Sequence, residues 1–167
     1  VDSSVYYFQK ALTKLETKEQ IANCQNNLGL MLKLQGNLDV SIQNYLLALS
    51  TYKSLGDIQK QVSILVNIGS LHKAMGETKE ALSYFEQAMQ MAFSIGDDEG
   101  INQCKANIAG VYVSEEKYAA ALNLIRGTHK YYSENNAYMD LTVAKNNMAN
   151  CLYKLNKIDS AKLLYTE

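Results

Sequence analysis

Apolar residues recur along the chain at the spacing of one face of an α-helix. Leu28, Met31 and Leu32 form one such face, and Ile42 and Tyr45 begin the next. The same spacing continues to the end of the chain. It predicts helices over about 1–15, 17–35, 38–55, 57–75, 78–95, 97–115, 118–134, 137–155 and 158–167.

The pattern of apolar and polar positions repeats itself. A shift of 40 residues aligns Asn27-Leu28-Gly29 with Asn67-Ile68-Gly69, Asn107-Ile108-Ala109 and Asn147-Met148-Ala149, without any insertion or deletion. A period within about 20–50 residues is typical of solenoids, in which each unit buries its apolar face only by stacking on its neighbours. Each unit here predicts a pair of amphipathic helices.

Glycine and capping residues mark the ends of these helices. Gly36 and Gly76 fall where the first helix of a unit ends, because glycine adopts the left-handed cap conformation without steric cost. The other joints follow similar signals: Gly56 and Gly96 end second helices, Asp57 and Asp97 offer a side-chain oxygen to the helices that follow, and Thr17 with Gln20 predicts a capping box. Near the end of the chain, Asn135-Asn136 replaces the helix-ending glycine.

Small residues occupy one slot of each first helix. Gly29, Gly69, Ala109 and Ala149 share this slot, which leaves room for a neighbouring helix to approach closely. We therefore expect a bulky residue at Gly69 to overpack the contact.

These residues resemble the tetratricopeptide pattern: the Leu28-Gly29 pair, Gly76 before a second helix, and then Ala81, Phe85 and Ala88. The resemblance implies an all-α fold, a right-handed superhelical solenoid of stacked antiparallel helix pairs. The period is 40 residues rather than about 34, and Gly-Asp replaces the usual terminal proline. Both departures resemble the long-helix branch found in Pins-type adaptors, kinesin light chains and sensory segments of bacterial regulators.

We interpret residues 1–167 as a single solenoid domain. Residues 1–16 align with the second helix of a truncated repeat, 17–56, 57–96 and 97–136 with full repeats, and 137–167 with an incomplete repeat. The ragged ends suggest a fragment of a longer protein. The alternative is that the exposed terminal helices pair with another copy, which makes a homo-oligomer.

The resemblance also implies that the first helix of each pair lines a concave groove. The side chains expected there face neither the core nor a neighbouring helix. They are Asn23, Asn27, Leu30 and Lys33 in the first full repeat, Asn67, Ser70 and Lys73 in the second, Gln103 and Asn107 in the third, and Asn147, Asn150 and Tyr153 in the incomplete repeat.

The asparagine at 27, 67, 107 and 147 is the most informative of these positions. An amide side chain both donates and accepts hydrogen bonds, so it can hold a peptide backbone whatever the peptide's side chains are. Helices about 8–10 Å apart match about three residues of extended chain. The alternative is that these amides tie adjacent repeats together through backbone carbonyls.

Two groove lysines, Lys33 and Lys73, resemble part of the carboxylate clamp of chaperone-binding repeats. The same slot holds Val113 and Tyr153 in the third and fourth copies, which departs from that pattern. Solvated lysines are the simpler interpretation.

Composition and charge argue against several other classes of function. Sixteen basic and seventeen acidic residues leave a net charge of -1, without the basic stripe expected of a nucleic-acid or anionic-membrane surface. No apolar run approaches the roughly 20 residues needed to span a bilayer. Three widely separated cysteines, Cys24, Cys104 and Cys151, argue against a disulfide framework, and all fall in core slots.

The sequence also offers no catalytic or metal-binding motif. His72 and His129 lie far apart in slots that are otherwise apolar, without zinc-ligand spacing, and no phosphate loop or nucleophile elbow is present. We therefore predict a non-catalytic module without cofactor or metal that binds a protein or peptide segment. It would be the sensory or scaffolding part of a regulatory protein. The alternative is a self-associating spacer. The expected compartment is the cytoplasm, with a periplasmic sensory domain as the alternative.

Overall fold

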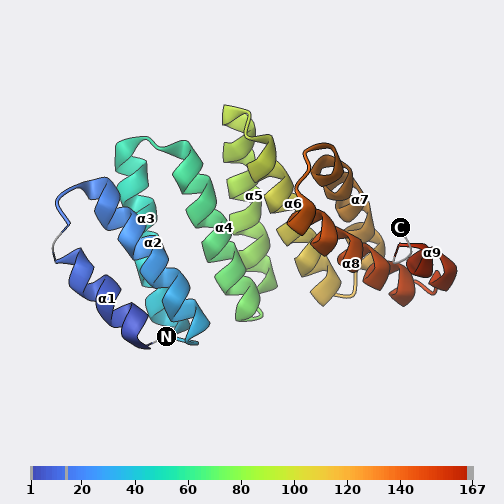
Figure 1. Ribbon diagram of the computed structural model, residues 1–167, viewed down its shortest axis with the longest axis horizontal. Coiled ribbons are helices and arrows are strands. Elements are labelled where there is room, and N and C mark those ends of the chain that lie inside the picture. Colours follow the sequence, from blue (N-terminus) through green and yellow to red (C-terminus); the bar gives the residue numbers. More distant parts are fainter. Residues whose placement is uncertain (1, 14, 165–167) are drawn as a thin grey trace. The chain divides into compact units, whose positions relative to one another are not determined.

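The computed structural model describes residues 2–13 and 15–164, and these residues form nine helices (Figure 1). The helices are α1 (Asp2–Leu12), α2 (Lys18–Leu34), α3 (Leu38–Leu55), α4 (Ile58–Ala74), α5 (Thr78–Ile95), α6 (Asp98–Ser114), α7 (Tyr118–Glu134), α8 (Tyr138–Lys154) and α9 (Ile158–Leu163). The expected helices are confirmed, although α1 ends earlier than the sequence suggests. The expected end of the last helix, 165–167, lies outside the described residues.

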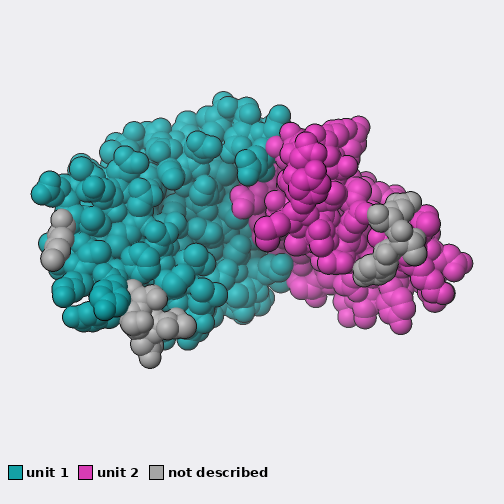
Figure 2. Space-filling view, viewed as in Figure 1, with its two compact units in different colours: residues 1–100 teal, residues 101–167 magenta. Residues whose placement is uncertain are grey.

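The chain divides into two compact units (Figure 2). Unit 1 comprises residues 1–100 and contains α1 to α5 with the first turn of α6. Unit 2 comprises residues 101–167 and contains the rest of α6 with α7, α8 and α9. Within unit 1, α1 to α5 lie side by side, and tight turns join the successive helices from α2 to α5 (Figure 1).

The helix ends form as the sequence predicts. Thr17 Oγ1 accepts a hydrogen bond from the Gln20 backbone N–H at 3.2 Å, and Gln20 Oε1 accepts one from the Thr17 N–H at 3.2 Å, which completes the capping box. Asp57 Oδ1 accepts from the Lys60 N–H at 2.9 Å at the start of α4. Asp97 caps α6 in the same way. These bonds satisfy amides that a helix otherwise leaves unpaired at its N-terminus.

In unit 1, an aromatic ring of each second helix lies against a glycine of the first helix. A Cβ atom on Gly69 would lie 2.7 and 2.8 Å from the Phe85 ring, and one on Gly29 would lie 2.9 Å from the Tyr45 ring. Both rings are fully buried. The small residue therefore lets the second helix approach the first closely, as the sequence predicts.

Close approach of α2 and α3 also permits a buried polar contact. Ser41 Oγ donates a hydrogen bond to the Gly29 carbonyl oxygen at 2.6 Å. Because Gly29 carries no side chain, α3 comes near enough to reach the α2 backbone, and the buried hydroxyl is satisfied.

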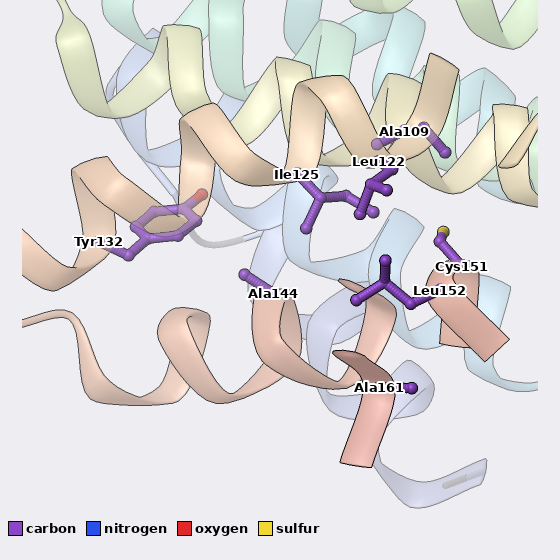
Figure 3. Close-up of a cluster of buried hydrophobic side chains, with 9 residues drawn as sticks. Ala109, Leu122, Ile125, Tyr132, Ala144, Cys151, Leu152 and Ala161 are labelled. Carbon is purple, nitrogen blue, oxygen red and sulfur yellow. The ribbon is translucent and has the colours of Figure 1, made fainter. Parts of the chain in front are cut away.

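The core of unit 2 uses a different pair of residues in the same two slots. Ala109 takes the place of the glycine and Ile125 the place of the aromatic residue, and both belong to one buried cluster (Figure 3). The other members of the cluster are Ala121, Leu122, Tyr132, Ala144, Cys151, Leu152 and Ala161. Ala109 is larger than the glycine of unit 1, and Ile125 is smaller than the aromatic residue of unit 1, so the two changes compensate each other.

All three cysteines are buried thiols, as their apolar slots predict. Burial raises the pKa of the Cys24 and Cys151 thiols, which disfavours the reactive thiolate. In unit 1, Cys24 Sγ also donates to the Phe8 carbonyl oxygen at 3.4 Å, which joins α2 to α1.

The packing rule is that a larger residue on the first helix requires a smaller one at the facing position of the second helix. Exchanging Gly69 and Phe85 for the alanine and isoleucine found in unit 2 tests it. We expect Gly69→Ala to lower the free energy of unfolding, because an overpacking cost of about 1–3 kcal/mol exceeds the roughly 1 kcal/mol that alanine gains as a helix former. The double variant Gly69→Ala/Phe85→Ile should recover most of that loss. Urea unfolding of wild type, both single variants and the double variant measures the coupling. Additive effects would contradict the rule.

The turn between α6 and α7 provides a second test. Glu116 occupies the slot of Gly36 and Gly76, with φ of 58°, a conformation that costs a residue with a Cβ about 1–2 kcal/mol. We expect Glu116→Gly to raise the free energy of unfolding by about 0.5–1 kcal/mol, after allowance for the greater flexibility of glycine in the unfolded chain. Glu86→Gly, on the exposed side of α5, is the control and should lower it by a similar amount. Calorimetry distinguishes the two outcomes.

Candidate functional site

The first helices of unit 1, α2 and α4, contact each other and carry seven of the expected groove residues. Asn27 and Leu30 are exposed, and Leu30 is 41% accessible. Lys33, Ser70 and Lys73 are half-buried. The structure thus places these side chains on two adjacent helices, partly accessible to solvent.

One of the recurring asparagines joins adjacent repeats. Asn67 Nδ2 on α4 donates a hydrogen bond to Asn26 Oδ1 on α2 at 2.9 Å, in a partly buried setting. This contact matches the structural alternative for the asparagines, except that the acceptor is a side-chain amide and not a backbone carbonyl.

The other asparagines do not repeat this contact. Asn107 Nδ2 donates to the Gln103 carbonyl oxygen of its own helix at 3.0 Å. Asn147 on α8 lines a small cavity of about 40 Å³ together with Ala106 on α6, and Ala106 occupies the slot of Asn26. An alanine side chain cannot accept a hydrogen bond. Among the described residues, Asn27 and Asn147 make no hydrogen bond through their amides.

Asn23 has a contact that periodicity does not reveal. The Tyr52 hydroxyl donates a hydrogen bond to Asn23 Oδ1 at 2.7 Å and so joins α3 to α2. The slot of Tyr52 holds Ala92 in the next repeat and Tyr132 in the one after, so the tyrosine recurs only in alternate repeats. Asn23 therefore stabilises the helix pair with its carbonyl oxygen and keeps its amide N–H groups.

In unit 2, the expected site residues lie on α6 and α8. Gln103, Asn147, Asn150 and Tyr153 are exposed, and Tyr153 is 63% accessible. Val143, one turn before Asn147, is 58% accessible. The exposed side of α8 thus combines amides with apolar and aromatic groups.

A larger cleft of about 420 Å³ lies between α8 and α9, lined by Ala149, Asn150, Tyr153, Ile158, Ala161 and Lys162. Ala149 holds the slot of Gly29 and Gly69, where a ring of the second helix packs in unit 1. The corresponding ring position is Tyr165, outside the described residues. We therefore place the candidate site on the exposed side chains of the first helices and not in this cleft.

Lys33 and Lys73 lie in the same slot of α2 and α4, near the C-terminal ends of these helices. Burial lowers the pKa of both ammonium groups, and the positive charge of Lys73 lowers the pKa of Lys33 further. Both ammonium groups are therefore partly desolvated.

His72 has a structural environment that accounts for a polar residue in an apolar slot. Its Nδ1 lies 2.6 Å from Glu77 Oε2, and its ring stacks on Tyr84 with centroids 5.1 Å apart. Among the described residues, no group of three or more His, Cys, Asp or Glu side chains is arranged to hold a metal ion. No described helix combines the length and apolar character needed to cross a membrane.

Residues 20–94 match the family model of the tetratricopeptide repeat. Within residues 20–94 the chain carries tetratricopeptide repeats. This finding and the fold of stacked helix pairs confirm the resemblance inferred from the sequence. Among curated proteins, the chain is similar to trafficking protein particle complex subunit 12 of Mus musculus, with 26% identity over 159 residues, 92% of this chain and 19% of that protein. The chain thus spans only a small part of this relative.

Solved structures share the fold at low sequence identity. Aspartyl phosphate phosphatase F from Bacillus subtilis superimposes with a TM-score of 0.89 and 20% identity, covering 98% of this chain and 44% of that one. The Rap conjugation gene regulator of plasmid pLS20, solved in complex with the Phr* peptide, superimposes with a TM-score of 0.86 and 18% identity, covering 97% and 46%. At these identities the likeness establishes the fold alone.

The half-buried lysine pair leads to a prediction about stability. We expect Lys33→Met and Lys73→Met each to raise the melting temperature by about 1–3 °C, because methionine keeps an apolar stem and removes a partly desolvated charge. Below the lowered pKa the charge is present in the fold at a cost. Wild-type stability therefore rises with pH between that pKa and the ordinary value of 10.5, and the advantage of the variants shrinks there.

The matched control for these variants is Lys53→Met. Lys53 is exposed and also lies in the last turn of its helix, α3, so it shares the favourable interaction with the helix dipole without the burial. Its replacement should leave the melting temperature unchanged or lower it. Thermal unfolding followed by circular dichroism across pH measures all three variants, and equal shifts for Lys53 and Lys33 would contradict the interpretation.

Proposed function

We propose that this chain is a non-catalytic module that binds a segment of another protein or a peptide along the exposed side of its first helices. In unit 1 this exposed side belongs to α2 and α4, and in unit 2, taken by itself, it belongs to α6 and α8. Tetratricopeptide repeats support this proposal at the level of a protein-binding scaffold, and the pLS20 regulator of the same fold was solved with a peptide. The proposed partner is a protein or peptide, not a nucleic acid or a membrane.

The observation that carries the proposal is the difference in hydrogen bonding among the recurring asparagines. Asparagine inside a helix costs about 0.5 kcal/mol relative to alanine, so its presence in all four repeats calls for a compensating contact. A bond between repeats supplies that contact only for Asn67. Asn27 and Asn147 keep amide groups without an intramolecular partner among the described residues, and a bound backbone would satisfy their donors and acceptors.

The asparagines therefore form two classes: Asn27 and Asn147 have no intramolecular partner among the described residues, whereas Asn67 joins two repeats. Both classes can be tested together. Peptides selected from a random linear library on the immobilised wild-type chain provide the probe, and fluorescence anisotropy measures their affinity. We expect Asn27→Ala and Asn147→Ala each to weaken binding about fivefold, the loss of roughly 1 kcal/mol for one hydrogen bond, without loss of stability. Asn67→Ala should lower the free energy of unfolding, because it leaves Asn26 without its donor.

The alternative function, self-association, has a separate readout. Light scattering of the wild-type chain over a range of concentrations measures its oligomeric state. If no peptide is selected and the chain self-associates, the spacer interpretation replaces the binding module. If selected peptides bind Asn27→Ala and Asn147→Ala as well as wild type, the amides have no role in binding.

A further inference from the structure

The cavity of about 40 Å³ in unit 2 arises where three slots hold small residues. Ala106 on α6, Ile125 on α7 and Ala144 on α8 all line it, and the last two belong to the buried cluster of Figure 3. Two repeats earlier, in unit 1, the same slots hold the larger residues Asn26, Tyr45 and Ile64. Interiors are otherwise close-packed, so three smaller side chains at neighbouring positions account for the space.

Exposed residues of α8 form one side of this cavity. Asp140, Val143 and Asn147 follow one another along successive turns of α8 and all line it. All three are exposed, and Val143 is 58% accessible. They lie on the side of α8 that the proposed function assigns to the partner. A segment bound along α8 therefore passes over the cavity.

The cavity also has polar groups with unused hydrogen-bonding capacity. Thr128 on α7 lines it and is only 1% accessible, and its hydroxyl donates to the Ile125 carbonyl oxygen at 3.0 Å. The Thr128 oxygen can therefore still accept a hydrogen bond. The Asn147 amide has no intramolecular partner among the described residues, because Ala106 stands where unit 1 has the acceptor Asn26.

The size and charge of the cavity indicate which group it accepts. A water molecule takes about 30 Å³ of liquid volume, so the cavity has room for one group of that size and not for a ring. A hydroxyl donates and accepts, which matches Thr128 and Asn147. An ammonium group only donates, and its charge would lose hydration beside the neutral, buried Thr128. The carboxylate of Asp140 belongs to an exposed residue.

We propose that the segment bound by this module carries a serine or threonine whose hydroxyl enters the cavity of unit 2. There it donates a hydrogen bond to Thr128 Oγ1 and accepts one from Asn147 Nδ2. This inference rests on the proposed function and names a side chain that the site selects. A hydroxyl that keeps both hydrogen bonds replaces water in the cavity without leaving a buried polar group unpaired.

Peptide selection on variants with a filled cavity tests the inference. Ala106→Asn introduces the amide that unit 1 has at this slot, and Ala144→Ile fills the space with carbon and leaves the Asn147 amide unpaired. The control is Ala74→Asn, at an exposed position of the first helix α4 in unit 1. We expect peptides selected from a random linear library on wild type and on the control to share a serine or threonine. Peptides selected on the two filled variants should show no such preference.

A double-mutant cycle locates the contact. One peptide selected on wild type is synthesised with its shared serine or threonine and again with alanine in its place. On wild type this change should weaken binding at least about fivefold, as expected for the loss of one hydrogen bond. On Ala144→Ile, and on Thr128→Val, which removes the buried acceptor and keeps the branched shape, it should have little effect. Melting curves establish which variants are folded, and Thr128→Val keeps the test decisive if a filled variant does not fold.

The outcomes separate this inference from the proposed function. Peptides that bind wild type and depend on Asn27 or Asn147, but share no serine or threonine, overturn the inference and leave the binding module intact. A hydroxyl preference that persists on the filled variants also overturns it, since the cavity then holds only water. A shared lysine or arginine in place of the hydroxyl does so as well, because Asp140 then selects a cation. If no peptide is selected on wild type, the proposed function fails, and the inference with it.

Discussion

The contact between an aromatic ring of the second helix and a glycine of the first helix sets the geometry of unit 1. With a Cβ atom on Gly69, the Phe85 ring would have to move, and the two helices would separate. Interiors are close-packed, so such a shift propagates to every side chain that the pair buries. The bond from Ser41 Oγ to the Gly29 carbonyl oxygen depends on the same close approach. The side chains that face away from this contact become the candidate site.

Those parts of the structure that depend on local signals are predictable from the sequence. The capping box at Thr17, the cap at Asp57 and the left-handed glycines each involve residues only a few positions apart. The small-residue slot is also predictable, because it recurs every 40 residues against an equally regular large residue. From α2 to α8, local chemistry and a strict repeat together specify where each helix begins, where it ends and which face it buries.

The contacts of the site residues depend instead on partners far away in the sequence. Asn67 donates a hydrogen bond to Asn26, a residue 41 positions earlier, and Asn23 accepts one from Tyr52, 29 positions later. Each partner occupies a slot whose residue type changes from repeat to repeat. The repeat pattern therefore predicts that the asparagines share one location, but it does not predict that they share one role. That role depends on whether the neighbouring slot holds a hydrogen-bond acceptor.

The same reasoning explains why the two units differ in chemistry. Where unit 1 carries Lys33 and Lys73, the aligned residues in unit 2 are Val113 and Tyr153. Burial makes the lysines costly to the fold, whereas a valine or tyrosine at this slot carries no charge to desolvate. At this slot the surface of unit 1 thus carries charge, while the first helices of unit 2 offer amides and exposed apolar groups.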